Sequence, residues 1–550
     1  MNRRRGQGFG ALLLAIGVIA AACTPTAQPS ATATPATAAS GQPKAGGTLN
    51  VWLTGKPSLF SPIAAAIESN TMVMQLIYGR LVELNEKNEV VPELAERWEV
   101  SPDATKFTFH LRKGVKWSDG ASFTCKDALF TFKARMDPRT GSPVGLPEVK
   151  GAADFKDGKT TAPAGLQCVD DATFQIELDL GNAALLAGNI ASNPTAWFIM
   201  PEHILGAVDP NALGKHAFFL NPTVGTGPFT FVRYETDQFV ELKRNPNYWQ
   251  APKPYLERVF FKLVTQDVAG AQLEKGEMQL ARVTADNAER LSKVPGVSVQ
   301  SAPGTGPTIF TVPQEKPEWK DKRIRQALMH AIDREALIKQ IAKGYGSITN
   351  THLLGPAWAL ETSLKTYPYD PEKAKSLLKE AGYDVNRTNK LQWTPGADPI
   401  RDQIVPLLQG YLAAVGVKTE LNPLQPAPHL DNIAKNTYDL VLYGGGNYVA
   451  DPEAVAVTVS CAGWYPKGAN IPHYCNPRVD ELFVAGRATS DQAKRAPIYK
   501  EISRIINDEV PWVWVMVPDT IYAASKKLGG FKVVGNSTWN FWNAESWWLE

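Results

Sequence analysis

The strongest constraint on the fold is a regular alternation of helix and strand patterns between residues 370 and 443. Asp370-Pro371 predicts a helix start and Gly382 its end, because proline suits the first helical turn and glycine commonly follows a helix. The pattern continues with a strand near 391–393, a helix over about 399–415, a strand near 417–421, a short helix and a buried strand over 439–443. This alternation predicts an α/β lobe with a largely parallel sheet.

A helical pattern also precedes this region. Apolar residues recur every four positions at Ile324, Leu328 and Ile332. This spacing is typical of the buried face of a helix. It predicts one amphipathic helix that begins after Asp321 and ends at Gly344.

The first half of the chain contains strands with a buried face and an exposed face. Residues 106–112 alternate strictly between polar and apolar, and Phe174, Ile176, Leu178 and Leu180 repeat the pattern. Helical sequence around 126–135 separates the two strands. Together they predict an antiparallel α+β subdomain, in which His110 occupies a solvated strand position.

The beginning of the chain resembles a lipoprotein export signal. Arginines at positions 3–5 precede an apolar run from Phe9 to Ala22, and Cys23 follows it. We expect residues 1–22 to be a cleaved signal peptide and Cys23 to carry a membrane-anchoring lipid. The alternative is an ordinary cleaved signal with an incidental cysteine. Residues 23–45 are rich in Ala, Thr, Pro and Ser, which predicts a flexible tether and an extracytoplasmic protein anchored at a membrane.

Composition and motifs narrow the functional classes. The 57 Lys and Arg nearly balance the 55 Asp and Glu, so the chain lacks the basic surplus typical of nucleic-acid binding. The sequence contains no G-x-S-x-G, H-E-x-x-H or P-loop motif, and its seven histidines are scattered. We therefore expect no catalysis, no cofactor and no metal site, with an exported hydrolase as the less favoured alternative.

The cysteines other than Cys23 predict two disulfides. Cys125, Cys168, Cys461 and Cys475 form an even set, as expected for an exported protein. Three connectivities are possible, and sequence proximity favours Cys125 with Cys168 and Cys461 with Cys475. A zinc site is the alternative, but CxxC spacing is absent.

Four stretches resemble the family 5 extracellular solute-binding proteins, the peptide and oligopeptide receptors of ABC importers. They span residues 76–120, ending in "KWSDG", and 225–264, which begins "GTGPF" and contains "NPNYW". The other two are "DKRIRQALMHAIDREALI" from Asp321 and "YDPEKAKSLLKEAGY" from Tyr369. They follow the family's order along the chain.

The resemblance implies a mixed α/β, two-lobed clamp with an extra antiparallel subdomain in a discontinuous first lobe. The first lobe would contain residues 46–302 and 517–550, and the second lobe residues 303–516. A monomer of this kind would capture a peptide between its lobes and deliver it to an ABC permease with its ATPase. Relatives with this scaffold also take sugar oligomers or metal complexes, which are the alternative ligands.

The candidate ligand site follows the last predicted strand of the α/β lobe. Ligands tend to bind beyond the carboxyl ends of such strands, which points to Tyr443 and to Gly444, Gly445 and Gly446. Glycines there would let a ligand's backbone approach closely.

The residues after the glycines depart from the family pattern. Peptide-binding members usually carry an aspartate about three residues before an Asp-Pro pair, where this chain has Tyr448, with Asn447 one residue earlier. Asp451 either binds a ligand's ammonium group or caps a helix. Trp393 is a candidate wall of the site and Trp464 a candidate rim residue, although a core role is as plausible for Trp393.

Overall fold

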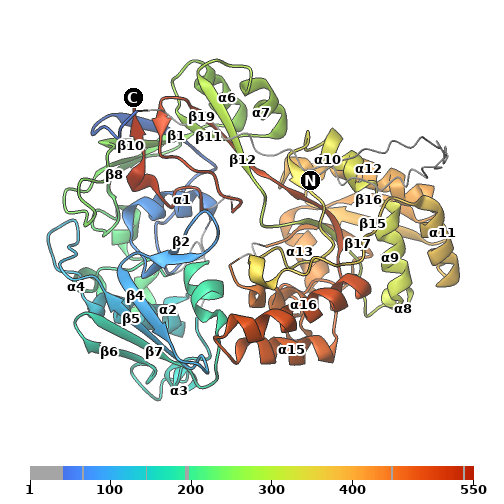
Figure 1. Ribbon diagram of the computed structural model, residues 1–550, viewed down its shortest axis with the longest axis horizontal. Helices are drawn as coiled ribbons and strands as arrows, with labels where there is room; N and C mark the ends of the chain where they lie inside the picture. Colours follow the sequence, from blue (N-terminus) through green and yellow to red (C-terminus); the bar gives the residue numbers. More distant parts are fainter. Residues whose placement is uncertain (1–40, 65–66, 144, 193–196, 447–449, 537–538) are drawn as a thin grey trace, which may run out of the picture. The chain divides into compact units, whose positions relative to one another are not determined.

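The computed structural model describes residues 41–64, 67–143, 145–192, 197–446, 450–536 and 539–550 (Figure 1). The predicted signal peptide, Cys23 and most of the predicted tether lie outside the described residues. Within the described part of the chain, no helix has the length and apolar character needed to span a membrane.

The first large sheet has seven strands and draws on both ends of the described chain. Its order is β12 (Val297–Ala302), β19 (Thr520–Ser525), β11 (Leu280–Arg282), β1 (Thr48–Leu53), β10 (Arg258–Leu263), β9 (Phe239–Arg244) and β8 (Phe229–Glu235). β1 pairs in parallel with β10 and β11, and the other pairs are antiparallel. Helices α1 (Glu68–Ile77), α6 (Gln266–Glu274) and α7 (Ala285–Leu291) contribute residues to its apolar core.

The predicted antiparallel subdomain is confirmed. It consists of β4 (Ala95–Val100), β5 (Lys106–Leu111), β7 (Thr173–Glu177) and β6 (Leu166–Asp170), with α2 (Cys125–Met136) packed against β6 and β7. Alternate residues of β5 are buried, as predicted. The prediction was wrong for Leu180, which is 78% exposed because β7 ends at Glu177.

The second large sheet has six strands, in the order β14 (Gly346–Ser347), β18 (Val513–Pro518), β13 (Thr308–Thr311), β17 (Leu440–Gly444), β15 (Thr388–Trp393) and β16 (Lys418–Pro423). β15 pairs in parallel with β16 and β17, whereas β13 pairs antiparallel with β17 and β18. The prediction of a largely parallel sheet was therefore wrong. The reason is that β13 and β18 come from outside the alternating region and complete the sheet.

Helices of the second sheet's region follow the predicted boundaries, with one exception. α11 (Pro371–Glu380) and α12 (Pro399–Ala414) begin and end near the expected residues, and α13 (Pro426–Ala434) is the predicted short helix. Two further helices, for which no boundary was predicted, are α15 (Pro477–Arg487) and α16 (Gln492–Glu509). The single helix predicted before Gly344 is two helices, α9 (Lys322–Ala331) and α10 (Arg334–Gln340). Ile332 is extended, and Asp333 starts the second helix by accepting a hydrogen bond from the backbone of Ala336.

The chain passes between the two large sheets at two neighbouring connections. Residues 303–307 join β12 to β13, and Asp519 lies between β18 and β19. The connections are in close contact, because a Cβ on Gly304 would lie 1.9 Å from the Pro518 carbonyl oxygen. The first connection follows the predicted boundary at 302/303, whereas the predicted boundary at 516/517 falls within β18, two residues before the second connection.

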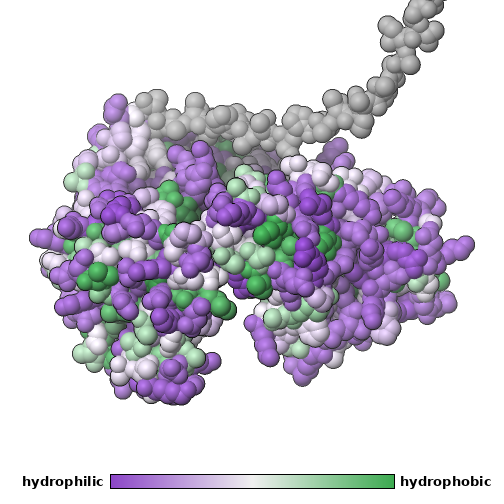
Figure 2. Space-filling model, turned by 60° about the horizontal axis from the view of Figure 1, so that its bottom comes forward, coloured by the Kyte–Doolittle hydropathy of each residue, from purple (hydrophilic) through white to green (hydrophobic). Residues whose placement is uncertain are grey.

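Apolar residues are mostly in the cores of the two sheets and the subdomain. Trp512, Trp514, Trp539, Trp547 and Trp548 are all buried, and Trp542 is half-buried. On the face shown in Figure 2, hydrophilic residues predominate and hydrophobic residues form small patches. This distribution is ordinary for a globular protein.

Both predicted disulfides are present, Cys125 with Cys168 and Cys461 with Cys475. They close loops of 43 and 14 residues. In the chain-entropy model, each bond stabilises the protein by restricting the unfolded chain. We expect Cys125→Ala/Cys168→Ala to lower the free energy of unfolding by about 4 kcal/mol. Cys461→Ala/Cys475→Ala should lower it by about 3 kcal/mol. Urea denaturation measures both, and unchanged midpoints would contradict the expectation.

Candidate functional site

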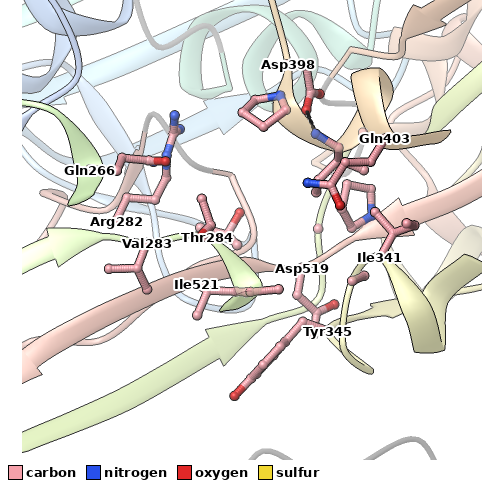
Figure 3. Close-up of a pocket in the computed structure, with 18 of the residues that line it drawn as sticks. Gln266, Arg282, Val283, Thr284, Ile341, Tyr345, Asp398, Gln403, Asp519 and Ile521 are labelled. Atoms are coloured by element: carbon pink, nitrogen blue, oxygen red, sulfur yellow. Dashed lines mark hydrogen bonds between the residues drawn. The ribbon is translucent and has the colours of Figure 1, made fainter. Parts of the chain in front are cut away.

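The first of two cavities near the predicted site lies beside the connections between the sheets, and we call it the crossover cavity (Figure 3). Its volume is about 460 Å³. Its wall includes Gln266, Arg282 and Thr284 from the first sheet's region, and Asp398 and Gln403 from the N-terminal part of α12. The connection itself contributes Asp519.

The wall of the crossover cavity contains both polar and apolar residues, and several of its charged groups already have partners. Arg282 contacts Glu68 at 2.7 Å, and Asp398 accepts hydrogen bonds from the Ile400 backbone and from Arg401 Nε. Burial raises the pKa of Asp519 to about 6, although a backbone N–H of Gly304 opposes the shift. The cavity can therefore offer a ligand both hydrogen-bonding groups and a carboxylate.

The second cavity lies at the end of β17 within the second sheet's region, and we call it the apolar cavity. It has a volume of about 290 Å³. Tyr443 and the three glycines at 444–446 form part of its wall, together with side chains that include Ile309, Ile471 and Trp512. The site predicted from the glycine sequence thus borders a real cavity.

Gly445 belongs to the walls of both cavities. Its N–H donates to the Pro307 carbonyl oxygen at 2.7 Å, and an added Cβ would lie 2.7 Å from Pro307 Cδ. Glycine is required here because the segment before β13 packs directly against it. The close backbone approach expected from the glycines is therefore made, at this residue, to the protein's own chain.

Two buried histidines at or beside the apolar cavity are neutral at pH 7. Burial lowers the pKa of His352, which lines the cavity, to about 3, and its Nδ1 accepts a hydrogen bond from Trp514 Nε1 at 3.0 Å. Burial also lowers the pKa of His429 to about 4, and the nearby Arg401 adds to this shift. The His429 ring stacks on Tyr443, with ring centroids 6.0 Å apart.

Asp451 is committed to contacts within the protein. Its carboxylate accepts hydrogen bonds from Arg495 Nη1 and Nη2 at 2.9 and 2.8 Å, and both side chains are only 4% exposed. Asp451 also accepts the Glu453 N–H, which caps the short helix that begins at Pro452. This geometry matches the helix-cap interpretation. Asn447 and Tyr448 lie outside the described residues.

The two predicted aromatic residues lie near the cavities without appearing in either wall. Trp393 ends β15 and donates from Nε1 to Asp402 Oδ1 at 3.0 Å, while its ring packs against the core. Trp464 stacks on His473 at 4.6 Å and donates to the Tyr474 carbonyl oxygen. The neighbouring Tyr465 lines the apolar cavity instead.

Several wall residues were not predicted from the sequence. Ile309 lies opposite Tyr443 in the pairing of β13 with β17, and Trp512 immediately precedes β18. Both come from segments far from the glycines along the chain. Trp512 belongs to the buried core and also forms part of the cavity wall.

The depressed pKa of His352 predicts acid sensitivity. The unfolded chain takes up a proton below pH 6.5, whereas the folded protein resists protonation down to about pH 3. Stability should therefore fall as the pH drops, by about 2 kcal/mol between pH 6.5 and pH 5 from this group alone. We expect His352→Gln to reduce the loss, measured by urea denaturation at each pH. An unchanged acid loss in the His352→Gln variant would contradict this expectation.

Comparison with known proteins identifies the relatives of this architecture. The model for bacterial extracellular solute-binding proteins, family 5, matches residues 89–466. A putative ABC transporter peptide-binding protein of Brucella ovis is 29% identical over 86% of this chain and 87% of its own length. The dipeptide-binding protein of Escherichia coli is 29% identical over 83% of this chain and 86% of its own length.

A solved structure shows the same fold. The ABC transporter substrate-binding protein CtaP of Listeria monocytogenes has 27% sequence identity and a TM-score of 0.80. The alignment covers 92% of this chain and all of CtaP. These relatives are binding proteins. Among the described residues of this chain, no cluster of His, Cys, Asp or Glu is arranged to hold a metal ion.

Proposed function

Because the chain belongs to the family 5 bacterial extracellular solute-binding proteins, we propose that it captures a short peptide outside the cytoplasm and delivers it to an ABC transporter. The observation that carries the proposal is the glycine segment 444–446, which borders the apolar cavity and, through Gly445, also the crossover cavity with its polar groups. A peptide has a uniform polar main chain and varied side chains. The crossover cavity offers polar groups for the main chain, and the apolar cavity offers an apolar environment for a side chain.

The polar groups of the crossover cavity suit the main chain of a peptide. Amides need donors and acceptors, which Gln266, Thr284 and Gln403 supply there. The names of the relatives agree with peptide binding. The Brucella ovis relative is named a putative ABC transporter peptide-binding protein, and the Escherichia coli relative is named a dipeptide-binding protein.

We further propose that the ligand closes two lobes, residues 46–302 with 517–550 and residues 303–516. The wall of the crossover cavity contains residues from both, such as Arg282 of the first and Asp398 of the second. A ligand in this cavity would contact both lobes at once. It would shift the equilibrium towards the closed form, because the open form lacks one set of contacts.

Titration calorimetry tests the peptide proposal. We expect short peptides to bind the purified protein with a dissociation constant of about 10 μM or lower. Maltotriose and a nickel–histidine complex represent the sugar and metal-complex alternatives and should give no heat of binding. Tight binding of maltotriose or of the nickel–histidine complex, with no heat of binding from any peptide, would contradict the proposal.

The role of the peptide's amino group is a separate test. Asp451 is paired with Arg495, and Asn447 stands near the position where peptide-binding relatives carry an aspartate. We therefore expect N-acetylation of a bound peptide to weaken binding by less than about 5-fold, because the Asp451 carboxylate is already paired with Arg495 and is not available to the amino group. A loss of 100-fold or more would show that a carboxylate of the protein binds it.

We propose that the protein acts as a monomer anchored to the membrane by acylation of Cys23. The sequence before this cysteine resembles a lipoprotein signal. Cells fed an alkyne-tagged fatty acid should label the wild-type protein and not the Cys23→Ser variant. Equal labelling of both would exclude this anchor.

A further inference from the structure

Most of the side chains that line the apolar cavity are aliphatic or aromatic. Ile309, Ile471, Tyr443, Tyr465 and Trp512 line it together with His352. Ile309, Ile471 and Trp512 are almost completely buried and also belong to the core of the second sheet's region. Core packing holds these walls in place, so the cavity is part of a rigid element of the fold.

The described residues that line this cavity carry no formal charge at neutral pH. They include no Asp, Glu, Lys or Arg, and His352 is neutral because burial lowers its pKa to about 3. A charged group placed in such surroundings would lose its hydration without gaining a counterion.

Several polar atoms of the wall have partners inside the protein. Trp512 Nε1 donates to the Thr458 carbonyl oxygen at 3.2 Å, and Thr458 Oγ1 donates to the Val455 carbonyl oxygen at 2.7 Å. Trp514 Nε1 donates to His352 Nδ1. A polar side chain entering the cavity would therefore compete with existing hydrogen bonds.

One edge of the cavity is the glycine segment 444–446, which has no side chains of its own. A peptide whose main chain runs along this segment could direct a side chain past the glycines into the cavity. The volume of about 290 Å³ is at the lower end of small-molecule sites, a size suited to one large side chain.

We infer that the apolar cavity is a selectivity pocket that takes one uncharged, apolar side chain of the bound peptide, of the size of leucine or phenylalanine. The inference rests on the proposed peptide-binding function and adds the chemical class of peptide. At one position of the peptide, apolar residues should bind well, whereas lysine and glutamate should bind poorly.

A positional scan of a tripeptide tests this inference. The probes are Ala-Ala-Ala and its variants with Leu, Phe, Lys or Glu at each of the three positions, with binding measured by titration calorimetry. At one position, Leu and Phe should bind at least about 100-fold more tightly than Lys and Glu. The other positions should vary much less.

A matched pair of variants tests whether this cavity is responsible. Ala469 lines the cavity, and its backbone N–H donates to the Val457 carbonyl oxygen at 2.9 Å, a contact that a new side chain leaves intact. Ala469→Asp places a carboxylate in the cavity, and Ala469→Asn places an amide of the same shape there. The aspartate variant should raise the Lys-to-Leu affinity ratio at the selective position by at least about 10-fold over the asparagine variant.

The outcomes separate the two proposals. If no tripeptide binds, the proposed peptide-binding function fails. If tripeptides bind and the wild-type protein accepts Lys, Glu and Leu equally at every position, the selectivity pocket is wrong and peptide binding stands. If selectivity exists but the two Ala469 variants do not differ, another surface produces it and the assignment of this cavity is overturned.

Discussion

Replacing Asp451 with alanine should lower the free energy of unfolding by about 3–5 kcal/mol, because it leaves a buried guanidinium without its counterion. Arg495 would keep its bonds to the Gly486 carbonyl oxygen and to Tyr499, which do not neutralise its charge. The energy measures the cost of breaking the pair and not the net value of forming it. Urea denaturation of the variant gives the difference.

Two controls sharpen this test. Asp431→Ala removes an exposed partner of Lys435 on α13 and should cost less than about 1 kcal/mol. The double variant Asp451→Leu/Arg495→Met removes both charges and should cost clearly less than the sum of the single replacements. A loss below about 1 kcal/mol for Asp451→Ala would show that this carboxylate is not required by the fold and is available to a ligand.

The second large effect is expected from Arg325, a buried arginine of α9 bonded to main-chain oxygens. It donates to the carbonyl oxygens of Trp319 and Lys320, and to those of Glu509 and Val510 where α16 ends. Burial lowers its pKa to about 10, so it remains charged at pH 7. Arg325→Met should cost about 3–5 kcal/mol, because several buried carbonyls lose their donors together.

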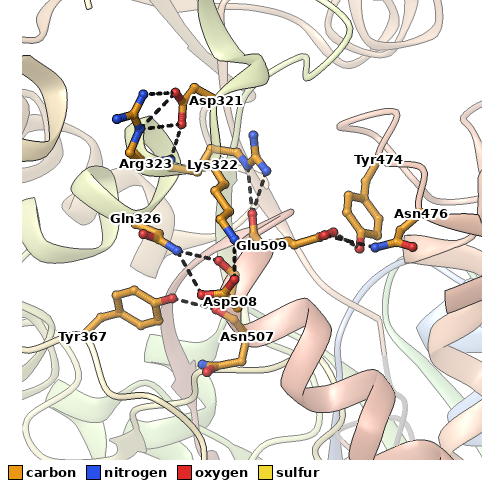
Figure 4. A network of polar contacts seen from close by, with 11 residues as sticks. Asp321, Lys322, Arg323, Gln326, Tyr367, Tyr474, Asn476, Asn507, Asp508 and Glu509 are labelled. Atoms are coloured by element: carbon orange, nitrogen blue, oxygen red, sulfur yellow. Dashed lines mark hydrogen bonds and ion pairs between the residues drawn. The ribbon is translucent and has the colours of Figure 1, made fainter. Parts of the chain in front are cut away.

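The neighbouring polar side chains cannot take over the hydrogen bonds that Arg325 makes. Figure 4 shows Lys322 and Gln326 reaching Asp508, while Tyr474 and Asn476 reach the side chain of Glu509. These groups already have hydrogen-bond partners, so they cannot bond to the carbonyl oxygens that lose Arg325. Arg323→Ala on the same helix is the control, since its pair with Asp321 lies at the surface and should contribute less than about 1 kcal/mol. Equal losses for the two variants would contradict the account.

The parts of the fold that depend on local pattern could be predicted from the sequence. β5 is confirmed because its alternate residues are buried on one face, and α11 because Asp370 caps it and Gly382 follows it with a φ of +69°. In both elements, the signal and the structure involve neighbouring residues.

The errors arose where distant segments decide the structure. β13 pairs with β17 and β18, more than a hundred residues away, and no local pattern indicates that pairing. The break between α9 and α10 had a local signal, because Asp333 is a favourable first residue for a helix. The apolar spacing continues through Ile332, and for this reason the pattern predicted one continuous helix.

The candidate site was predictable to a similar degree. The predicted glycine segment 444–446 borders the apolar cavity, and Gly445 borders both cavities. The other wall residues of the apolar cavity come from β13, from the segment around His352 and from Trp512, among others, which the fold brings together. The partner of Asp451 is also unpredictable from spacing, because Arg495 lies 44 residues away and on another helix.

Native mass spectrometry of the freshly purified protein tests the central claim most directly. Gentle ionisation preserves the complex, and fragmentation of the released solute identifies its chemical class. The account predicts a noncovalently bound peptide of a few residues, with an apolar residue enriched at one position. A sugar oligomer or a metal complex as the bound solute would contradict it, as would the recovery of a hydrolysed product when intact peptide is added.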